Sequence, residues 1–255
     1  MIDVERRDGV AIVRLDHGKV HALDDVLLGE LLDVLDDVER SGAGPGVRSV
    51  VLTATGRVFS AGVDLQKVLD GGATYIEKMM PLLMSAFERL FTFPLPVVAA
   101  VNGPAVAGGC ILACACDRRL LVEGGRIGAS ELLVGVAFPV SALEILRWAC
   151  GDRTEEVVLT GRLYESAEAV RVGLAHEIVA ADGLLDRALE VAGELGAVAP
   201  GAFRLAKAQL RRPATERIAA DAPTVDPDVL ALWSSAETTA SIRTQLERMA
   251  AARRS

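Results

Sequence analysis

The segment that most restricts the possible folds is VVAAVNGPAVAGGCILACACD, residues 97–117. Its first five residues, Val97–Val101, are all apolar and predict a buried strand. The Asn-Gly-Pro tripeptide that follows ends this strand. Gly108 and Gly109 then begin a run of small and apolar residues that predicts a helix extending to about Cys116. The chain therefore contains a buried strand that leads into the N-terminus of a helix.

The two glycines at this helix start permit close approach of a ligand or of another backbone. The first N–H groups of a helix have no partner within it, and the positive end of its dipole lies behind them, so an oxyanion would be bound well there. The sequence has neither G-x-G-x-x-G nor a G-K-[ST] ending at this point, which argues against a dinucleotide site or a P-loop. The alternative is that Gly108, Gly109, Ala113 and Ala115 only allow tight helix packing.

The composition limits the partners that the protein can have. Its 255 residues suffice for one large domain, or for one domain with an appendage. Hydrophobic residues make up 51% of the chain but aromatic residues only 4%, so the core must be mainly aliphatic. A net charge of -8 without a basic run argues against nucleic acid or an anionic membrane as the main partner.

The N-terminus lacks the layout of a signal peptide, and no apolar run reaches transmembrane length, so we expect a cytoplasmic protein. Of the four cysteines, Cys110, Cys114 and Cys116 fall within one short apolar helix and Cys150 lies further on. This arrangement argues against a disulfide framework and against a zinc site. We expect free thiols in the core and no bound metal.

Hydrophobic periodicity predicts alternating strands and helices up to about residue 182. The expected elements are strands at 2–4, 10–15, 47–53, 97–101, 118–122, 126–128 and 177–179, helices at 24–40, 75–90, 108–116 and from about 141, and segments 154–159 and 166–172 that continue the alternation. From residue 183 onward the pattern is helical, with helices expected at 184–195, 201–210 and 229–251 and an interruption at 222–228. We therefore divide the chain into a core, 1–182, and a C-terminal helical region, 183–255.

Four motifs occur in an order and spacing that resemble those of the crotonase, or enoyl-CoA hydratase/isomerase, superfamily. They are FSAGVDL at 59–65, AVNGPAVAGGC at 100–110, Cys-Asp at 116–117 and SELLVG at 130–135. The resemblance implies an α/β crotonase (ClpP-like) spiral of strand-strand-helix turns with a C-terminal helical region. It also implies an acyl-CoA thioester substrate, with coenzyme A as part of the substrate and no separate cofactor. The C-terminal helices would assemble a homotrimer or a dimer of trimers.

The resemblance further implies roles for individual residues. The family's two oxyanion-hole amides fall on Ala61 and Gly108, where two N–H donors would stabilise the negative charge that develops on a thioester oxygen. The family's second catalytic carboxylate falls on Glu131. The alternative for Glu131 is an ordinary exposed or salt-bridged acid at a helix end.

Three positions depart from the hydratase pattern. The first hydratase acid is replaced by Ile111, and the Gly-rich segment near the water site by the bulkier Phe138-Pro139. Both features resemble 3-enoyl-CoA to 2-enoyl-CoA isomerases that work with a single glutamate. The family's Asn-Ala-Leu near the adenine pocket appears as His21-Ala22-Leu23, which removes the Asn cap. The residues expected to line the substrate site are Ala22, Leu23, Gly62, Val63, Asp64, Leu65, Gly109, Ile111, Leu133, Phe138 and Pro139.

The sequence thus leads to three functional hypotheses. In the first, an isomerase uses Glu131 to move a proton from C2 to C4 of a 3-enoyl-CoA. In the second, a hydratase uses Glu144 or Glu123 as a replacement acid, although we expect Glu144 to be a surface acid paired with Arg147 or Arg153. In the third, a crotonase homologue binds acyl-CoA without turning it over.

Overall fold

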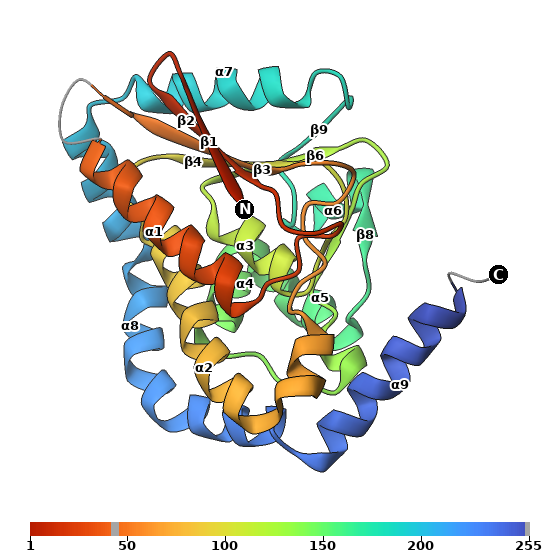
Figure 1. The fold of residues 1–255 in the computed structure, drawn as a ribbon. Helices are drawn as coiled ribbons and strands as arrows, with labels where there is room; N and C mark the ends of the chain where they lie inside the picture. The colour runs from red at the N-terminus through yellow and green to blue at the C-terminus, as the bar shows by residue number, and fades with distance from the viewer. Residues whose placement is uncertain (42–45, 253–255) are drawn as a thin grey trace.

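The computed structural model describes residues 1–41 and 46–252 and has the α/β architecture that the sequence predicts (Figure 1). In this described part, six strands form the main sheet. Their spatial order is β1 (Ile2–Arg7), β2 (Val10–Leu15), β3 (Ser49–Ala54), β4 (Val97–Val101), β6 (Arg118–Val122) and β9 (Glu177–Val179). The β1–β2 hairpin is antiparallel, and the other neighbours pair in parallel. Every residue of β3 and β4 is buried, as expected for parallel strands covered on both faces.

A smaller sheet and a set of helices complete the fold. The smaller sheet contains β5 (Ala105–Val106), β7 (Arg126–Gly128) and β8 (Tyr164–Glu165). The helices are α1 (Asp25–Ser41), α2 (Leu65–Phe91), α3 (Gly108–Ala115), α4 (Val140–Cys150), α5 (Thr154–Thr160), α6 (Ser166–Arg171), α7 (Leu184–Gly196), α8 (Pro200–Trp233) and α9 (Ala236–Ala252), with 3-10 turns η1 (Glu131–Val134) and η2 (Gly151–Arg153).

The two faces of the main sheet bury separate apolar clusters. In Figure 1, α7 covers the upper face, where its apolar residues pack on β2, β3, β4 and β6. The lower face carries the larger cluster, formed with α1, α2, α3 and α4. The cysteines lie in this larger cluster as buried free thiols. The division of the chain at residue 182 remains a prediction, and α7, which we assigned to the C-terminal region, covers the core sheet.

Two helices differ from the sequence prediction. The helix predicted at 75–90 forms the second part of α2, and the prediction missed the first part, which begins at Leu65, is capped by Asp64 and ends at the non-helical Gly72, where φ is 57°. Helix α8 continues to Trp233, so the break predicted at 222–228 is wrong. A proline inside a helix removes one hydrogen bond at a cost of about 3 kcal/mol. Side chains buried on both sides of the α8 prolines, such as Ile218 and Trp233, offset this loss.

A buried ion cluster attaches α8 to the core. Asp117, two residues beyond the end of α3, accepts from Lys207 Nζ and from Arg211 Nη2, each at 2.7 Å. Both cations are nearly inaccessible to solvent, and burial lowers the pKa of Lys207 to about 8 although Asp117 opposes that change. Removal of one partner from such a cluster leaves an uncompensated buried charge and costs about 3–5 kcal/mol. Asp117 therefore joins the C-terminal helices to the end of α3.

Each helix within residues 1–41 and 46–252 is too short or too polar to span a lipid bilayer.

Candidate active site

Two segments far apart in the sequence lie side by side at the C-terminal end of the main sheet. We call residues 17–24 the strap and residues 60–64 the amide loop. The Ala61 N–H donates a hydrogen bond to Val20 O at 2.9 Å. An N–H that already bonds inside the protein is not available to a substrate oxygen. Our assignment of Ala61 as an oxyanion-hole donor is therefore wrong.

The free amide of the loop belongs to Val63. Leu23 N donates to Gly62 O at 2.8 Å, and Asp64 N donates to Leu23 O at 3.0 Å. Leu23 and Val63 thus form a parallel bridge. In this pairing the Gly62 carbonyl and the Asp64 N–H face Leu23, while the N–H and the carbonyl of Val63 point to the opposite side. Among the described residues, the Val63 N–H has no acceptor. Val63, expected from the sequence only as a lining residue, replaces Ala61 as the candidate donor.

The start of α3 packs closely against the amide loop. A Cβ on Gly62 would lie 2.8 Å from Val106 O and 3.2 Å from Gly108 N. A Cβ on Gly109 would lie 2.5 Å from Ser60 O, so Gly109 allows close packing of helix against loop. The described chain provides no acceptor for the Gly108 N–H, as is usual at a helix start. The structure thus places the Gly108 amide against Gly62, the residue that precedes Val63.

Glu131 begins the turn η1 on the segment that follows β7. Ala107, just before Gly108, donates its N–H to Gly128 O at 2.9 Å, and this bond connects the Glu131 segment to the start of α3. The Glu131 side chain is buried, and its Oε2 has no hydrogen-bond partner among the described residues. The alternative of an exposed or salt-bridged acid is wrong.

Burial determines the acidity of Glu131. Loss of hydration raises the pKa of this carboxyl to about 8, against the opposing effect of its own backbone N–H. The nearby Cys114 thiol raises it further. A carboxyl with a pKa near the working pH can both take up and release a proton, which is the property required of a general acid/base.

The C-terminal helices hold the segment that follows Glu131. Trp233, the last residue of α8, donates its indole N–H to Ala137 O at 2.9 Å. Thr238, in α9, donates its hydroxyl to Gly135 O at 3.0 Å. Two different helices therefore fix the peptide chain immediately beyond η1. Sequence reasoning did not identify these contacts, since both cross about 100 residues of chain.

The other expected lining residues have different surroundings. Ile111 is fully buried in α3, and Phe138 and Pro139 are buried at the start of α4. Leu133 is 61% exposed and contacts the Gly161 turn.

On the other side of the site, Asp64 accepts from the backbone N–H groups of Gln66 and Lys67. Its carboxylate caps α2, and the assignment of Asp64 as a substrate-binding residue remains a prediction. Leu65 follows as the first residue of α2, and Ala22 is half-buried in the strap. The roles of Ala22 and Leu65 remain predictions.

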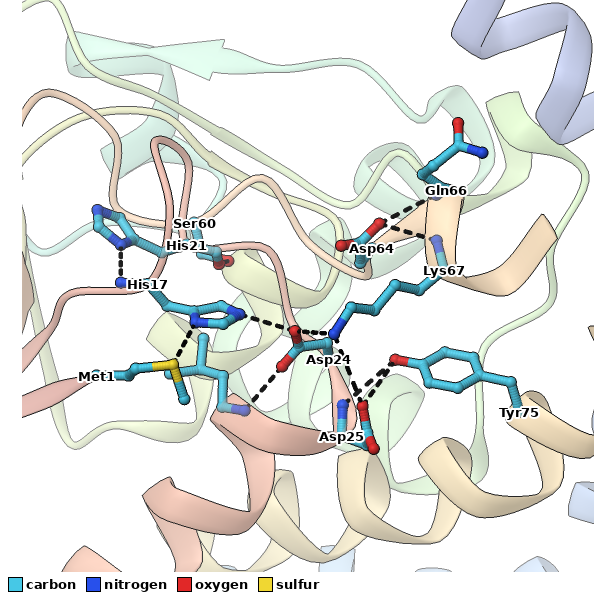
Figure 2. Close-up of polar contacts among 11 residues, drawn as sticks. Met1, His17, His21, Asp24, Asp25, Ser60, Asp64, Gln66, Lys67 and Tyr75 are labelled. Carbon is cyan, nitrogen blue, oxygen red and sulfur yellow. Dashed lines mark hydrogen bonds and ion pairs between the residues drawn. The ribbon is translucent and has the colours of Figure 1, made fainter. Parts of the chain in front are cut away.

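His21 corrects a further expectation. The sequence suggested that histidine at this position removes a side-chain cap. In the structure His21 Nδ1 accepts a hydrogen bond from the His17 N–H at 3.1 Å, so the imidazole itself makes a side-chain contact to the backbone of the strap (Figure 2).

Glu144 is not the surface acid that we expected. Its carboxylate is buried and pairs with Arg147, as predicted, and also with Arg217 of α8 at 2.6 Å. The second expected partner, Arg153, pairs with Glu156 instead. Both oxygens of the Glu144 carboxylate are therefore engaged by arginine side chains.

Comparisons with known proteins agree with this fold. The model of the enoyl-CoA hydratase/isomerase family matches residues 5–251. A putative enoyl-CoA hydratase of Thermus thermophilus is 38% identical over 210 residues, which cover 81% of this chain and 82% of that protein. Human mitochondrial enoyl-CoA delta isomerase 1 is 29% identical over 222 residues, covering 86% of this chain and 72% of that protein.

The crystal structure of human mitochondrial delta3-delta2-enoyl-CoA isomerase superposes with a TM-score of 0.91 at 28% identity, covering 97% of each chain. The fold and the length of the family match lead to one conclusion. The chain belongs to the enoyl-CoA hydratase/isomerase family, the crotonase superfamily, and acts in the enoyl-CoA chemistry of that family.

Proposed function

We propose that the protein is an isomerase that converts a 3-enoyl-CoA thioester into a 2-enoyl-CoA thioester. The observation that carries this proposal is Glu131, a buried carboxyl without an ionic partner among the described residues and with a pKa raised to about 8. At the position of the first hydratase acid the chain has Ile111, which is fully buried. One proton carrier is sufficient for isomerisation. Hydration usually employs two carboxyl groups, which share the activation of water and the delivery of a proton to C2.

The reaction needs one base and one oxyanion site. Glu131 takes a proton from C2, and the electron pair of that C–H bond delocalises onto the thioester oxygen to form a dienolate. The N–H groups of Val63 and Gly108 stabilise the negative oxygen, each by about 3 kcal/mol when well placed. Glu131 then returns the same proton to C4, and the double bond moves to the 2-position. No other reactant is consumed.

Hydration is the alternative, because the Thermus thermophilus relative is named a putative enoyl-CoA hydratase. A hydratase must orient a water molecule and also deliver a proton to C2. Glu144 is neutralised by two arginines, and Glu123 is exposed at the end of β6. Neither acid has the properties of the missing second group.

The ratio of two rates tests this assignment. We expect the protein to isomerise 3-hexenoyl-CoA much faster than it hydrates crotonyl-CoA, with products identified by mass and by double-bond position. The Glu131→Gln variant is the control for background reaction. A hydration-to-isomerisation ratio well above one would contradict the isomerase proposal. Tight acyl-CoA binding without either reaction would favour a non-catalytic homologue.

We also propose assembly into a homotrimer or a dimer of trimers. Leu205 and Leu210 of α8 are 61% and 62% exposed, and a second copy could cover them. Light scattering of the full-length protein should give a mass of three or six chains. A well-behaved monomer at micromolar concentration would contradict this expectation.

A further inference from the structure

The strap provides hydrogen-bond partners for three polar backbone groups of the amide loop, the Ala61 N–H, the Gly62 carbonyl and the Asp64 N–H. Besides the bonds of Ala61 and of the Leu23 bridge, the loop is tied to the strap by a side chain. Ser60, completely buried, donates its hydroxyl to His21 O at 2.8 Å. The same Oγ accepts the Gly62 N–H at 3.2 Å. One hydroxyl therefore occupies the Gly62 amide and connects it to the strap.

These bonds determine which amide of the loop stays free. The N–H groups of Ala61, Gly62 and Asp64 have acceptors within the loop or the strap, and the Ser60 N–H donates to Pro104 O at 3.2 Å. The remaining N–H, that of Val63, has none in the described chain. The Val63 N–H lies in the Gly62–Val63 peptide plane, whose carbonyl accepts from the Leu23 N–H, and Ser60 holds the preceding peptide plane through the Gly62 N–H. A change of the strap would therefore rotate the Val63 N–H.

The strap itself is held in an uncommon backbone conformation by His21. Its φ is 48°, a left-handed value that only a few per cent of non-glycine residues adopt. Its Nδ1 accepts from the His17 N–H, and its Nε2 donates to Thr55 O at 2.9 Å. The carbonyl can only accept, so the imidazole is the neutral form with the proton on Nε2. The side chain thus binds the strap on one side and the end of β3 on the other.

The end of the strap is fixed as well. Asp24, buried before α1, accepts from His17 Nε2 and from Lys67 Nζ, each at 2.7 Å, as Figure 2 shows. It also accepts the Leu27 N–H at 2.8 Å, so it caps α1. Lys67 belongs to the first turns of α2, which follows the amide loop, so its bond to Asp24 connects that end of the loop to the strap. Ser60 connects the other end.

We propose that Ser60 and His21 are positioning residues of the oxyanion hole: they set the direction of the Val63 N–H without contacting the substrate. This inference rests on the proposed oxyanion function of Val63 and Gly108. It assigns Ser60 and His21 to catalysis in addition to folding. A donor displaced by about 1 Å can cost about 100-fold in rate, which sets the size of the expected effect.

The first test is Ser60→Ala. This change removes two hydrogen bonds and no carbon atoms, so the packing is preserved. We expect kcat to fall about 10- to 100-fold while KM changes less than about threefold. The matched control is Ser49→Ala in β3, where a buried serine hydroxyl has no partner among the described residues. The control should retain kcat.

The second test compares two changes of His21. In His21→Asn, Oδ1 takes the place of Nδ1 on the same Cγ, and asparagine tolerates a positive φ. In His21→Phe, the ring remains but both hydrogen bonds are lost. We expect His21→Asn to keep kcat within about fivefold of the wild type and His21→Phe to lose at least tenfold, by the same argument from donor displacement.

The direct readout is the carbonyl stretch of bound hexanoyl-CoA labelled with ¹³C at C1, measured by difference infrared spectroscopy. This saturated thioester does not react, and donors on its oxygen lower the stretching frequency. We expect a lowered frequency in the wild type and in His21→Asn, and a shift back toward the free value in Ser60→Ala and His21→Phe. A frequency equal to the wild-type value in both of the latter variants would overturn the inference, as would no lowering in the wild type.

This readout separates the inference from the proposed function. If the wild type lowers the frequency but does not isomerise 3-hexenoyl-CoA, the isomerase proposal fails. The positioning roles then stand or fall on the frequencies of the Ser60 and His21 variants alone. If isomerisation and the lowered frequency both occur and Ser60→Ala retains both, the isomerase proposal stands and the inference fails.

Discussion

Glu131→Gln is expected to lower kcat for isomerisation at least about 100-fold, the lower limit for loss of a well-placed acid/base group. Glutamine has nearly the same shape but cannot accept a proton from carbon, so acyl-CoA binding should be retained. Turnover of 3-hexenoyl-CoA and binding of hexanoyl-CoA by calorimetry measure the two effects. A rate near that of the wild type would remove Glu131 from the mechanism.

The pH dependence of the wild type follows from the same carboxyl. A base must be ionised to act, and burial raises the pKa of Glu131 to about 8. The value of kcat/KM should therefore increase with pH below about 8 and level off above it. A plateau that already begins near pH 5 would show that the acting base has an ordinary carboxyl pKa.

The same shift links Glu131 to stability. Its folded-state pKa lies above the ordinary value of 4.5, so the folded protein binds this proton more tightly than the unfolded chain does. The contribution to stability is complete below pH 4.5 and is lost as pH rises through about 8. Glu131→Gln, which cannot ionise, should thus be more stable than the wild type at pH 9, by a few kcal/mol at about 1.4 kcal/mol per pKa unit. Urea unfolding at pH 5 and pH 9 measures the difference, and an identical pH dependence for both proteins would contradict it.

Local sequence patterns predicted the elements that carry the site. The apolar run of β4 and the glycines of α3 predict a strand followed by a helix start from residues that are adjacent in the sequence. The free Gly108 amide could therefore be identified from the sequence. The choice between Ala61 and Val63 could not, because it depends on hydrogen bonds to Val20 and Leu23, about 40 residues earlier. Local patterns do not specify which strand-like segments pair.

Burial of charged residues was the other source of error. Glu144 is charged and was expected at the surface, yet Arg217, 73 residues later, accompanies it into the interior. The same applies to Asp117, which pairs with Lys207 and Arg211 across about 90 residues. Ion-pair partners so far apart in the sequence meet only in the folded protein, so local sequence patterns do not predict them. In α8, tertiary contacts of this kind also outweigh the helix-breaking preference of proline.

The second large effect is expected for Gly62→Ala. At Gly62 the backbone has a φ of 81°, and a methyl group would lie 2.8 Å from Val106 O and 3.2 Å from Gly108 N. The added carbon must push the amide loop away from α3, which separates the Val63 and Gly108 donors. Because both donors act on one oxygen, we expect kcat to fall at least about 100-fold.

The left-handed backbone alone does not account for this loss, and a second glycine separates the two causes. Gly124, in the turn between β6 and β7, has a φ of 73°, and no atom of the described residues lies within 4 Å of its added Cβ. Gly124→Ala should cost about 1–2 kcal/mol in unfolding free energy from the positive φ and leave kcat unchanged. Gly62→Ala should show a comparable or larger loss of stability together with the loss of kcat. If kcat of Gly62→Ala stays within about threefold of that of Gly124→Ala, close approach of the amide loop to α3 is not required for turnover, and the oxyanion must be bound by other donors.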